Sequence, residues 1–156
     1  MASLHLHPPQ PGEPMLAATR VHVVAGKGVR EDPRYFDRVH PATGEPNRRQ
    51  LTLIEREQIQ AHAAALSLAG IAPGAVRANV ETMGIRLSDW LGQQALIGDA
   101  VVLIRAHREP CAKMDAVCAG LRALMAEGRQ GVVAEVLRSG TIQVGDALRP
   151  FSPGQS

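Results

Sequence analysis

The 156-residue chain is predicted to adopt a mainly β fold, a β-rich barrel with a few helices at its periphery. Three observations support this fold class. Short segments rich in β-branched residues recur along the chain, glycine-containing turns separate them, and few segments have helical periodicity. Strand and helix patterns do not alternate as in a Rossmann fold. The length allows one domain with a real core and is too short for two ordinary domains.

The chain is expected to begin with a flexible lead-in at residues 1–18, because four of its eleven prolines lie in this segment and its apolar periodicity is weak. His5 and His7 fall in the lead-in and are therefore expected to be poor ligand candidates. A barrel domain is predicted over residues 19–149, followed by a tail at residues 150–156.

The first half of the predicted domain contains two strands, a long loop and a helix. The β-branched segment 19–25 and the alternating segment 50–54 are expected to be strands. Residues 30–49 between them are charged and interrupted by prolines and glycine, which predicts a long loop. The alanine-rich segment 55–69 is predicted to be a helix that ends at Gly70.

The second half is dominated by strands. Residues 88–91 favour one short helical turn, and residues 95–106 read as a strand interrupted by a turn or bulge at Gly98-Asp99. Segments 131–137 and 141–144 flank Arg138-Ser139-Gly140 and predict a hairpin.

Composition excludes several classes of function. The formal charge is only +2, the basic residues are scattered, and aromatic residues make up 3% of the chain, so no nucleic-acid partner is expected. The N-terminus has no signal-peptide pattern and no uncharged apolar run approaches membrane-spanning length, so no membrane partner is expected. Two cysteines without a CxxC motif predict neither a disulfide framework nor a zinc site. The expectation is a soluble cytoplasmic protein.

Cys111, in the stretch HREPCAKM, is the candidate nucleophile or metal ligand. It lies where a strand pattern gives way to a helical one, and Pro110 disfavours an earlier helix start. A thiol in the first turn of a helix faces unpaired backbone N–H groups, and the flanking Arg108 and Lys113 favour a thiolate. Glu109 acts in the opposite sense. On these residues alone, an inert packed or exposed cysteine remains the alternative.

Cys118 is predicted to be structural, because it shares helical spacing with Met114, Leu121 and Met125. A Cys111–Cys118 disulfide would have to bridge two helical turns, about 10 Å, and is excluded. Arg77 and Asn79 are expected on the same side of an extended segment, where a cation and an amide suit a phosphate or a polar heterocycle. A solvated strand face is the alternative for this pair.

Taken in order, several stretches resemble the MOSC domain, named for the C-terminal domain of molybdenum-cofactor sulfurase. These stretches are VVAGKGV, RQLTLIERE, PGAVRANVETMGIRLSDWLGQQALIGDAVVLI, REPCAKM and GRQGVVAEVLRSGTIQVGDAL. The resemblance covers residues 21–148 and is carried by the ordered set rather than by any one piece.

The resemblance implies a distorted, mostly antiparallel β-barrel that binds molybdenum cofactor (molybdopterin). It implies that Cys111 either ligates molybdenum or carries a persulfide sulfur, and that Arg77 and Asn79 lie near the cofactor. Thr82 and Lys113 are weaker cofactor-binding candidates. One stretch departs from the family pattern Gly-Ile/Leu-x-Gly-Asp-Arg, since Glu31 replaces the second glycine and Pro33 displaces the arginine.

Three functions are compatible with this resemblance. The first is a molybdenum-dependent oxidoreductase that reduces N-hydroxylated compounds with electrons from a separate electron-transfer protein. The second is a persulfide carrier that takes sulfur from a cysteine desulfurase, in which case pyridoxal phosphate belongs to that partner. The third is a degenerate binding module without a catalytic site, which the altered Glu31-Asp32-Pro33 loop favours.

Overall fold

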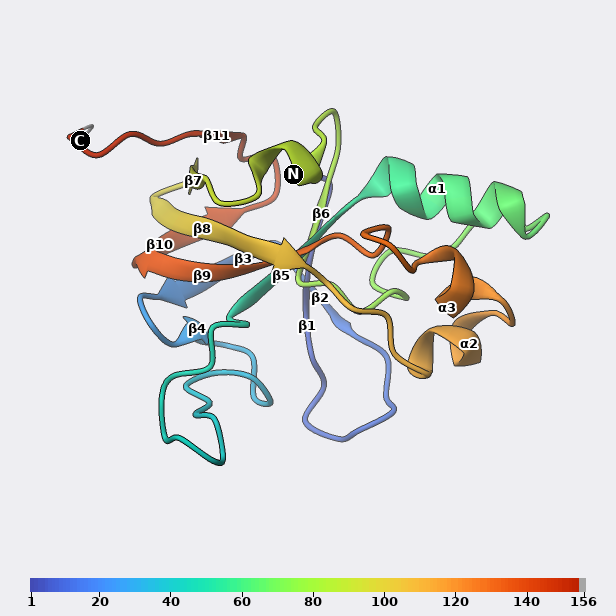
Figure 1. The fold of residues 1–156 in the computed structure, drawn as a ribbon, viewed down its shortest axis with the longest axis horizontal. Coiled ribbons are helices and arrows are strands. Elements are labelled where there is room, and N and C mark those ends of the chain that lie inside the picture. Colours follow the sequence, from blue (N-terminus) through green and yellow to red (C-terminus); the bar gives the residue numbers. More distant parts are fainter. Residues whose placement is uncertain (155–156) are drawn as a thin grey trace.

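The computed structural model describes residues 1–154 as a mainly β structure with its three α-helices on one side of the strands (Figure 1). The strands are β1 Ser3–Leu6, β2 Leu16–Ala18, β3 Arg20–Val24, β4 Gly28–Val29, β5 Leu51–Glu55, β6 Val80–Thr82, β7 Gln94–Ile97, β8 Ala100–His107, β9 Val132–Arg138, β10 Gly140–Gln143 and β11 Leu148–Pro150. The helices are α1 Arg56–Ala65, the 3₁₀ helix η1 Leu87–Trp90, α2 Lys113–Val117 and α3 Leu121–Leu124.

The strands form two sheets. An eight-stranded sheet in the order β11-β7-β8-β9-β5-β6-β1-β2 curls into a half-barrel, and a three-stranded sheet has the order β10-β3-β4. Neighbouring strands are antiparallel except for the parallel pair of β5 and β6. The prediction of a mainly β, mostly antiparallel barrel-like fold is therefore confirmed.

Two hydrophobic cores stabilise this arrangement. The larger core takes buried aliphatic side chains from both sheets, for example Val21, Leu53, Val102 and Ile142. The smaller core lies where the helices meet the sheet and contains Ile54, Ile59, Met114, Leu121 and Met125. Met114, Leu121 and Met125 of the predicted helical stripe are thus buried, and Cys118 packs against them, whereas Val117, which also has helical spacing, is 39% exposed. The two cysteines are free thiols.

The prediction of a flexible lead-in at residues 1–18 is wrong. β1 pairs with both β2 and β6, and Leu4 in β1 is 1% exposed. The prolines that suggested a flexible segment all lie in the connection between β1 and β2. The alternation in SLHL is sufficient for a four-residue strand once a sheet edge is available to pair with it. The predicted tail begins within β11, and residues 155–156 lie outside the described part of the chain.

The predicted hairpin around Arg138-Ser139-Gly140 is also wrong, because β9 pairs with β5 and β8 whereas β10 pairs with β3. The chain changes sheets at Gly140, where an added Cβ would lie 2.5 Å from the carbonyl carbon of Asp99. A turn signal predicts that the chain changes direction. It does not predict which strand the next segment will join.

The helices are shorter than the sequence predicts. α1 ends at Ala65 rather than near Ala69, and Ser67 adopts a left-handed conformation with φ of 54°. The predicted helix after Cys111 divides into α2 and α3, which are separated by Gly120 with φ of 89°. No helix among the described residues has the length and apolar character needed to cross a membrane.

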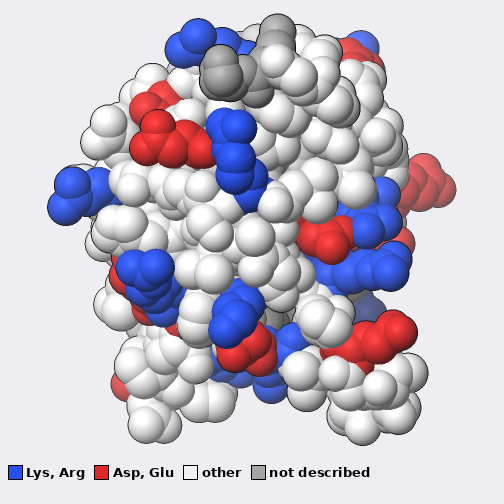
Figure 2. Space-filling view, turned by 90° about the vertical axis from the view of Figure 1, so that its left-hand side faces the viewer, with Lys and Arg blue, Asp and Glu red and all other residues white. Residues whose placement is uncertain are grey.

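Acidic and basic side chains are interspersed over the face shown in Figure 2, which has no continuous patch of one sign. This pattern agrees with the scattered distribution of charge along the sequence. The cations described below line one cavity.

Candidate functional site

Cys111 lies in the loop between β8 and α2, where its residue is exposed and its thiol is free. It borders a cavity of about 240 Å³. The cavity is lined by polar, charged and aromatic side chains from both halves of the chain, together with one methionine: His7, Tyr35, Arg49, Arg77, Arg108, Glu109, Cys111, Lys113, Met114 and Gln130. The fold therefore brings Cys111, Arg77 and Lys113, three of the five predicted site residues, to one cavity.

Four cations converge on this cavity, namely Arg49, Arg77, Arg108 and Lys113, against the single carboxylate of Glu109. Arg108 is 4% exposed, and its guanidinium donates to the carbonyl oxygens of Val76 (3.1 Å) and Arg77 (3.0 Å). Burial lowers the pKa of Arg108 to about 10, and the neighbouring Arg49 acts in the same direction. Arg108 still carries its charge at neutral pH, so the cavity attracts anions.

Several buried polar atoms on the cavity wall have no hydrogen-bond partner among residues 1–154. They are Nη2 of Arg77, Nε of Arg108 and Oε1 of Gln130. An unpaired buried donor or acceptor costs about 1–3 kcal/mol, and folded proteins rarely leave such groups without a reason. Two donors and one acceptor in a single cavity fit a polar ligand that carries an anionic group.

Asn79 and Arg77 have different surroundings in the structure. Arg77 has a left-handed φ of 63°, so the segment is not a regular strand at this position and β6 begins only at Val80. Asn79 is 7% exposed and is bonded to Thr52, His5 and Asp32. The expectation that Arg77 and Asn79 lie on the same side of an extended segment is therefore wrong. Asn79 does not line the cavity, and its side-chain amide donates to Asp32 instead.

Thr82 does not line the Cys111 cavity. It is 2% exposed in β6, and its hydroxyl donates to the carbonyl oxygen of Ile54 (3.4 Å). The expectation that Cys111 lies in the first turn of a helix is also wrong, because α2 starts at Lys113 and has only five residues. Cys111 precedes the first turn of this short helix, so its electrostatic surroundings are set by the side chains of the cavity.

The sequence interpretation missed several residues of the cavity, namely His7, Tyr35, Arg49 and Gln130. His7 is the one with the most defined contacts. Its Nδ1 lies 2.7 Å from Oδ2 of Asp32, and its ring packs on Tyr35 with the ring centroids 4.4 Å apart. The hydrophobic alternation of LHLH could have placed His5 and His7 on one face of a strand, but the prolines outweighed that signal. His5 is also buried, where it contacts Ser3 and Glu81 rather than the cavity.

The altered loop keeps its aspartate in a buried position, with Asp32 2% exposed. The backbone N–H groups of Arg34 and Tyr35 donate to its Oδ1. Burial raises the pKa of Asp32, but the hydrogen bonds from His7 and Arg34 outweigh this effect and hold the pKa below its usual value. Glu31, which replaces the family glycine, pairs instead with His22 on the surface.

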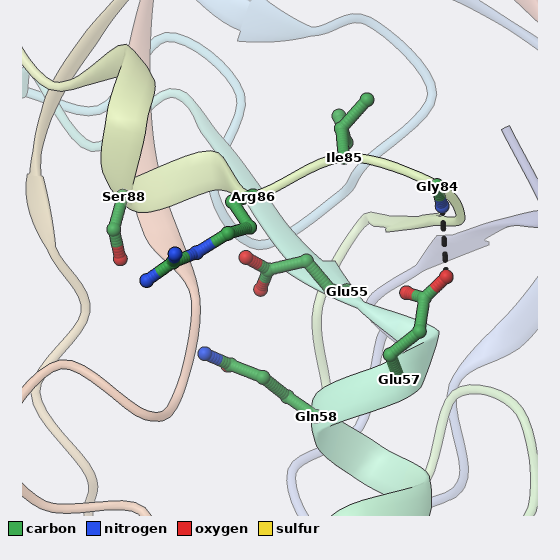
Figure 3. A pocket seen from close by; sticks show the side chains of 7 residues that line it. All are labelled: Glu55, Glu57, Gln58, Gly84, Ile85, Arg86 and Ser88. Carbon is green, nitrogen blue, oxygen red and sulfur yellow. Dashed lines mark hydrogen bonds between the residues drawn. The ribbon is translucent and has the colours of Figure 1, made fainter.

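Another cavity, of about 380 Å³, is larger than the Cys111 cavity and is lined by none of the predicted site residues (Figure 3). Here Glu57 accepts a hydrogen bond from the Gly84 N–H (2.7 Å), and Glu55 accepts one from the Leu87 N–H (2.8 Å). With its amide nitrogen facing acceptors, Gln58 donates to Glu55 and to the carbonyl oxygen of Arg129. The contacts of Glu55 and Glu57 attach the β6–η1 connection and the start of η1 to the junction of β5 and α1, which is a structural role.

Comparisons with known proteins agree with the fold and with the order of the motifs. The model of the MOSC domain matches residues 20–149. The YuaD protein from Bacillus subtilis is 20% identical and superposes with a TM-score of 0.78, covering 96% of this chain and 94% of that chain. YiiM from Geobacillus stearothermophilus is 18% identical with a TM-score of 0.70, covering 98% of this chain and 75% of that chain.

YiiM from Escherichia coli is also 18% identical, with a TM-score of 0.68 over 99% of this chain and 70% of that chain. At these identities the structural likeness shows the fold alone. No curated protein sequence matches the chain. The family model spans most of the chain, from β3 to β11, and includes the segment that carries Cys111. The chain therefore belongs to the MOSC domain family.

Proposed function

We propose that this protein binds molybdenum cofactor in the Cys111 cavity, with Cys111 as the protein ligand to molybdenum. The observation that carries the proposal is the meeting of an exposed free thiol with four cations and three unpaired buried polar atoms. A soft sulfur ligand suits molybdenum, and arginine side chains suit the cofactor's phosphate. A sulfur ligand for the metal and cations for the phosphate thus lie beside one another.

The residues divide into two roles. Arg77, Arg108 and Lys113 would hold the phosphate, and the side chain of Gln130 offers an acceptor to the ring edge of the pterin. Arg77 also lines two neighbouring hollows of about 290 and 260 Å³, so the binding surface continues beyond the Cys111 cavity. When bound, the cofactor supplies a two-electron redox centre. We expect reduction of N-hydroxylated compounds with electrons from a separate electron-transfer protein.

The deciding experiment compares Cys111→Ser with Cys118→Ser after expression in a molybdenum-replete host. Molybdenum is measured by plasma mass spectrometry and the pterin by fluorescence after oxidation. We expect about one molybdenum and one pterin per chain in the unmodified protein and in Cys118→Ser, with molybdenum lost from Cys111→Ser. Full molybdenum retention and activity in Cys111→Ser would refute the proposal.

The exposure of Cys111 favours a second function, because an exposed thiol beside cations is accessible to a cysteine desulfurase. In that case Cys111 carries a persulfide. Mass spectrometry after incubation with a pyridoxal-phosphate-dependent desulfurase and cysteine should then show one added sulfur on Cys111. An unmodified mass excludes the carrier function, and the absence of both sulfur and molybdenum supports a degenerate binding module.

A further inference from the structure

His7 and Asp32 form a buried pair on the wall of the Cys111 cavity. His7 is 6% exposed and Asp32 is 2% exposed. In the sequence, His7 directly follows β1, and Asp32 comes shortly after β4. Oδ2 of Asp32 lies 2.7 Å from Nδ1 of His7 and accepts a second hydrogen bond from the His7 backbone N–H (3.1 Å). The carboxylate thus contacts one residue through both its ring and its backbone.

These contacts fix the orientation of the imidazole ring. An ionised carboxylate can only accept hydrogen bonds, so Nδ1 of His7 carries the hydrogen that points to Asp32. The other oxygen of Asp32 is held by the N–H groups of Arg34 (3.1 Å) and Tyr35 (3.0 Å), which prevents the carboxylate from rotating. The side-chain amide of Asn79 also donates to Oδ2 of Asp32 (3.4 Å).

The second ring nitrogen of His7, Nε2, has no hydrogen-bond partner among the described residues. It lies on the ring edge away from Asp32, and the ring lines the same cavity as Cys111. A buried histidine whose Nδ1 is fixed by a carboxylate and whose Nε2 is left to a cavity is arranged to exchange a proton with a ligand. No other residue pair around the Cys111 cavity has this arrangement within residues 1–154.

We propose that His7, oriented by Asp32, donates a proton to the substrate at the Cys111 site. This inference rests on the proposed cofactor function and adds a catalytic residue to it. Reduction of an N-hydroxylated compound follows R–NHOH + 2e⁻ + 2H⁺ → R–NH₂ + H₂O, with both electrons from the external electron-transfer protein. The N–O bond breaks, the departing oxygen takes the Nε2 proton of imidazolium His7 and leaves as water, and nitrogen takes the second proton from solvent. Solvent then returns a proton to His7.

Several charged groups lie around His7. Asp32 is in direct contact with its ring, and Glu109 lines the same cavity. The cations Arg49, Arg77, Arg108 and Lys113 line this cavity as well.

The first test uses His7→Asn in the molybdenum-loaded protein, because an asparagine amide can still donate to Asp32 but provides no ring Nε2. Benzhydroxamic acid serves as the probe and dithionite-reduced methyl viologen as the electron source. Loss of a general acid should lower kcat about 100-fold or more. We expect KM to change less than about threefold and the molybdenum content to stay the same, and added imidazole to restore part of the rate. If His7 is the general acid, the rate of the unmodified protein should decline with rising pH, and this decline should disappear in His7→Asn.

His22→Asn is the matched control, because His22 also pairs through Nδ1 with a carboxylate, that of Glu31, but on the surface away from the cavity. It should keep the full kcat. If His7→Asn retains both kcat and the unmodified pH profile, the inference is wrong. The Cys111→Ser experiment tests the cofactor function separately. If Cys111→Ser loses molybdenum while His7→Asn keeps its full kcat, the cofactor function is supported and only the role of His7 is refuted.

A second measurement is independent of turnover. In cofactor-free protein labelled with ¹⁵N-histidine, alkylation of Cys111 with iodoacetamide places a carboxamide in the cavity. The Nε2 resonance of His7 should shift, whereas that of His22 should not. An unmoved His7 resonance would show that Nε2 does not face the ligand space and would overturn the inference.

Discussion

At the residue scale, Arg77 links backbone conformation to the candidate site. Its φ of 63° lies in the left-handed region, which costs a non-glycine residue about 1–2 kcal/mol. The turn is held by hydrogen bonds from the Arg77 N–H to Gly74 (3.0 Å) and from Arg108 to the Arg77 carbonyl oxygen (3.0 Å). The same conformation directs a guanidinium to the cavity, with Nη2 left unpaired.

We predict that Arg77→Gly leaves the stability of the fold nearly unchanged but weakens ligand binding. Glycine relieves the left-handed strain, so the free energy of unfolding should change by less than about 1 kcal/mol. Loss of the guanidinium should weaken cofactor retention about tenfold, a change typical of one charge-assisted hydrogen bond. Molybdenum content after dialysis measures this effect. The control is Thr82→Val, which lies outside the cavity and should keep its molybdenum; equal loss in both variants would contradict the assignment.

Asp32 gives a second prediction at this scale. Because its folded-state pKa is depressed, its stabilising contribution is complete above its ordinary value of 3.8 and is lost as the pH falls through the folded-state pKa. Asp32→Asn should therefore lower the free energy of unfolding by about 1–3 kcal/mol at pH 7. Urea denaturation of both proteins between pH 7 and pH 3 should show the difference shrinking only below 3.8. A difference that is independent of pH would contradict the role of this carboxylate charge.

At the element scale, the residue just before β9 positions the residue just after β8. Gly131 has φ of 80°, and its carbonyl oxygen accepts a hydrogen bond from the Arg108 N–H (2.9 Å). An added Cβ at Gly131 would lie 2.0 Å from the carbonyl oxygen of Leu53, in the neighbouring β5. Close approach of β9 to β5 thus holds Arg108, and through it the cation-rich wall of the cavity.

Gly131→Ala should destabilise the protein by about 3 kcal/mol or more, because backbone strain and a steric clash with β5 add together. The control is Gly145→Ala, which has a similar positive φ of 95° but no atom within 4 Å of the added Cβ. It should cost only about 1–2 kcal/mol for the backbone conformation. Urea unfolding midpoints compare the two variants. Equal losses of stability in the two variants would show that the close contact with β5 adds nothing to the destabilisation.

At the scale of the whole molecule, the N-terminal strand completes both the sheet and the cavity. β1 lies between β2 and β6 in the large sheet, and His7 follows it directly into the cavity wall. His7 and Cys111 therefore line the same cavity although they are more than a hundred positions apart in the sequence. A domain that began at residue 19 would lack one wall of its own site.

We predict that Leu4→Ala lowers the free energy of unfolding by about 2–5 kcal/mol, the usual cost of truncating a buried leucine. Leu4 is 1% exposed, whereas Leu16 in the paired strand β2 is 50% exposed. Leu16→Ala should change stability by less than about 0.5 kcal/mol. Thermal or urea unfolding checks both values, and an unaffected Leu4→Ala protein would mean that β1 contributes little to the core.

The local signals of the sequence were sufficient for much of the fold. β-Branched alternation predicted β3 and β5, the Gly98-Asp99 turn separated β7 from β8, and helical spacing predicted the buried Met114, Leu121 and Met125. The resemblance to the MOSC family came from the order of such segments, and the family model confirms it. The roles of Cys111, Arg77 and Lys113 stay predictions, although the fold brings these three residues to one cavity.

Tertiary structure decided what depends on contacts between distant segments. Strand pairing placed β1 in the sheet and sent β10 to β3, because sheet edges select partners that no local turn signal specifies. Backbone conformation separated Arg77 from Asn79, and packing buried His7 against Asp32 beside Cys111. The sequence by itself determined the family, the element types and the candidate thiol. Only the folded chain could determine which cations and which histidine surround that thiol, because they come from segments that are far apart until the sheet closes.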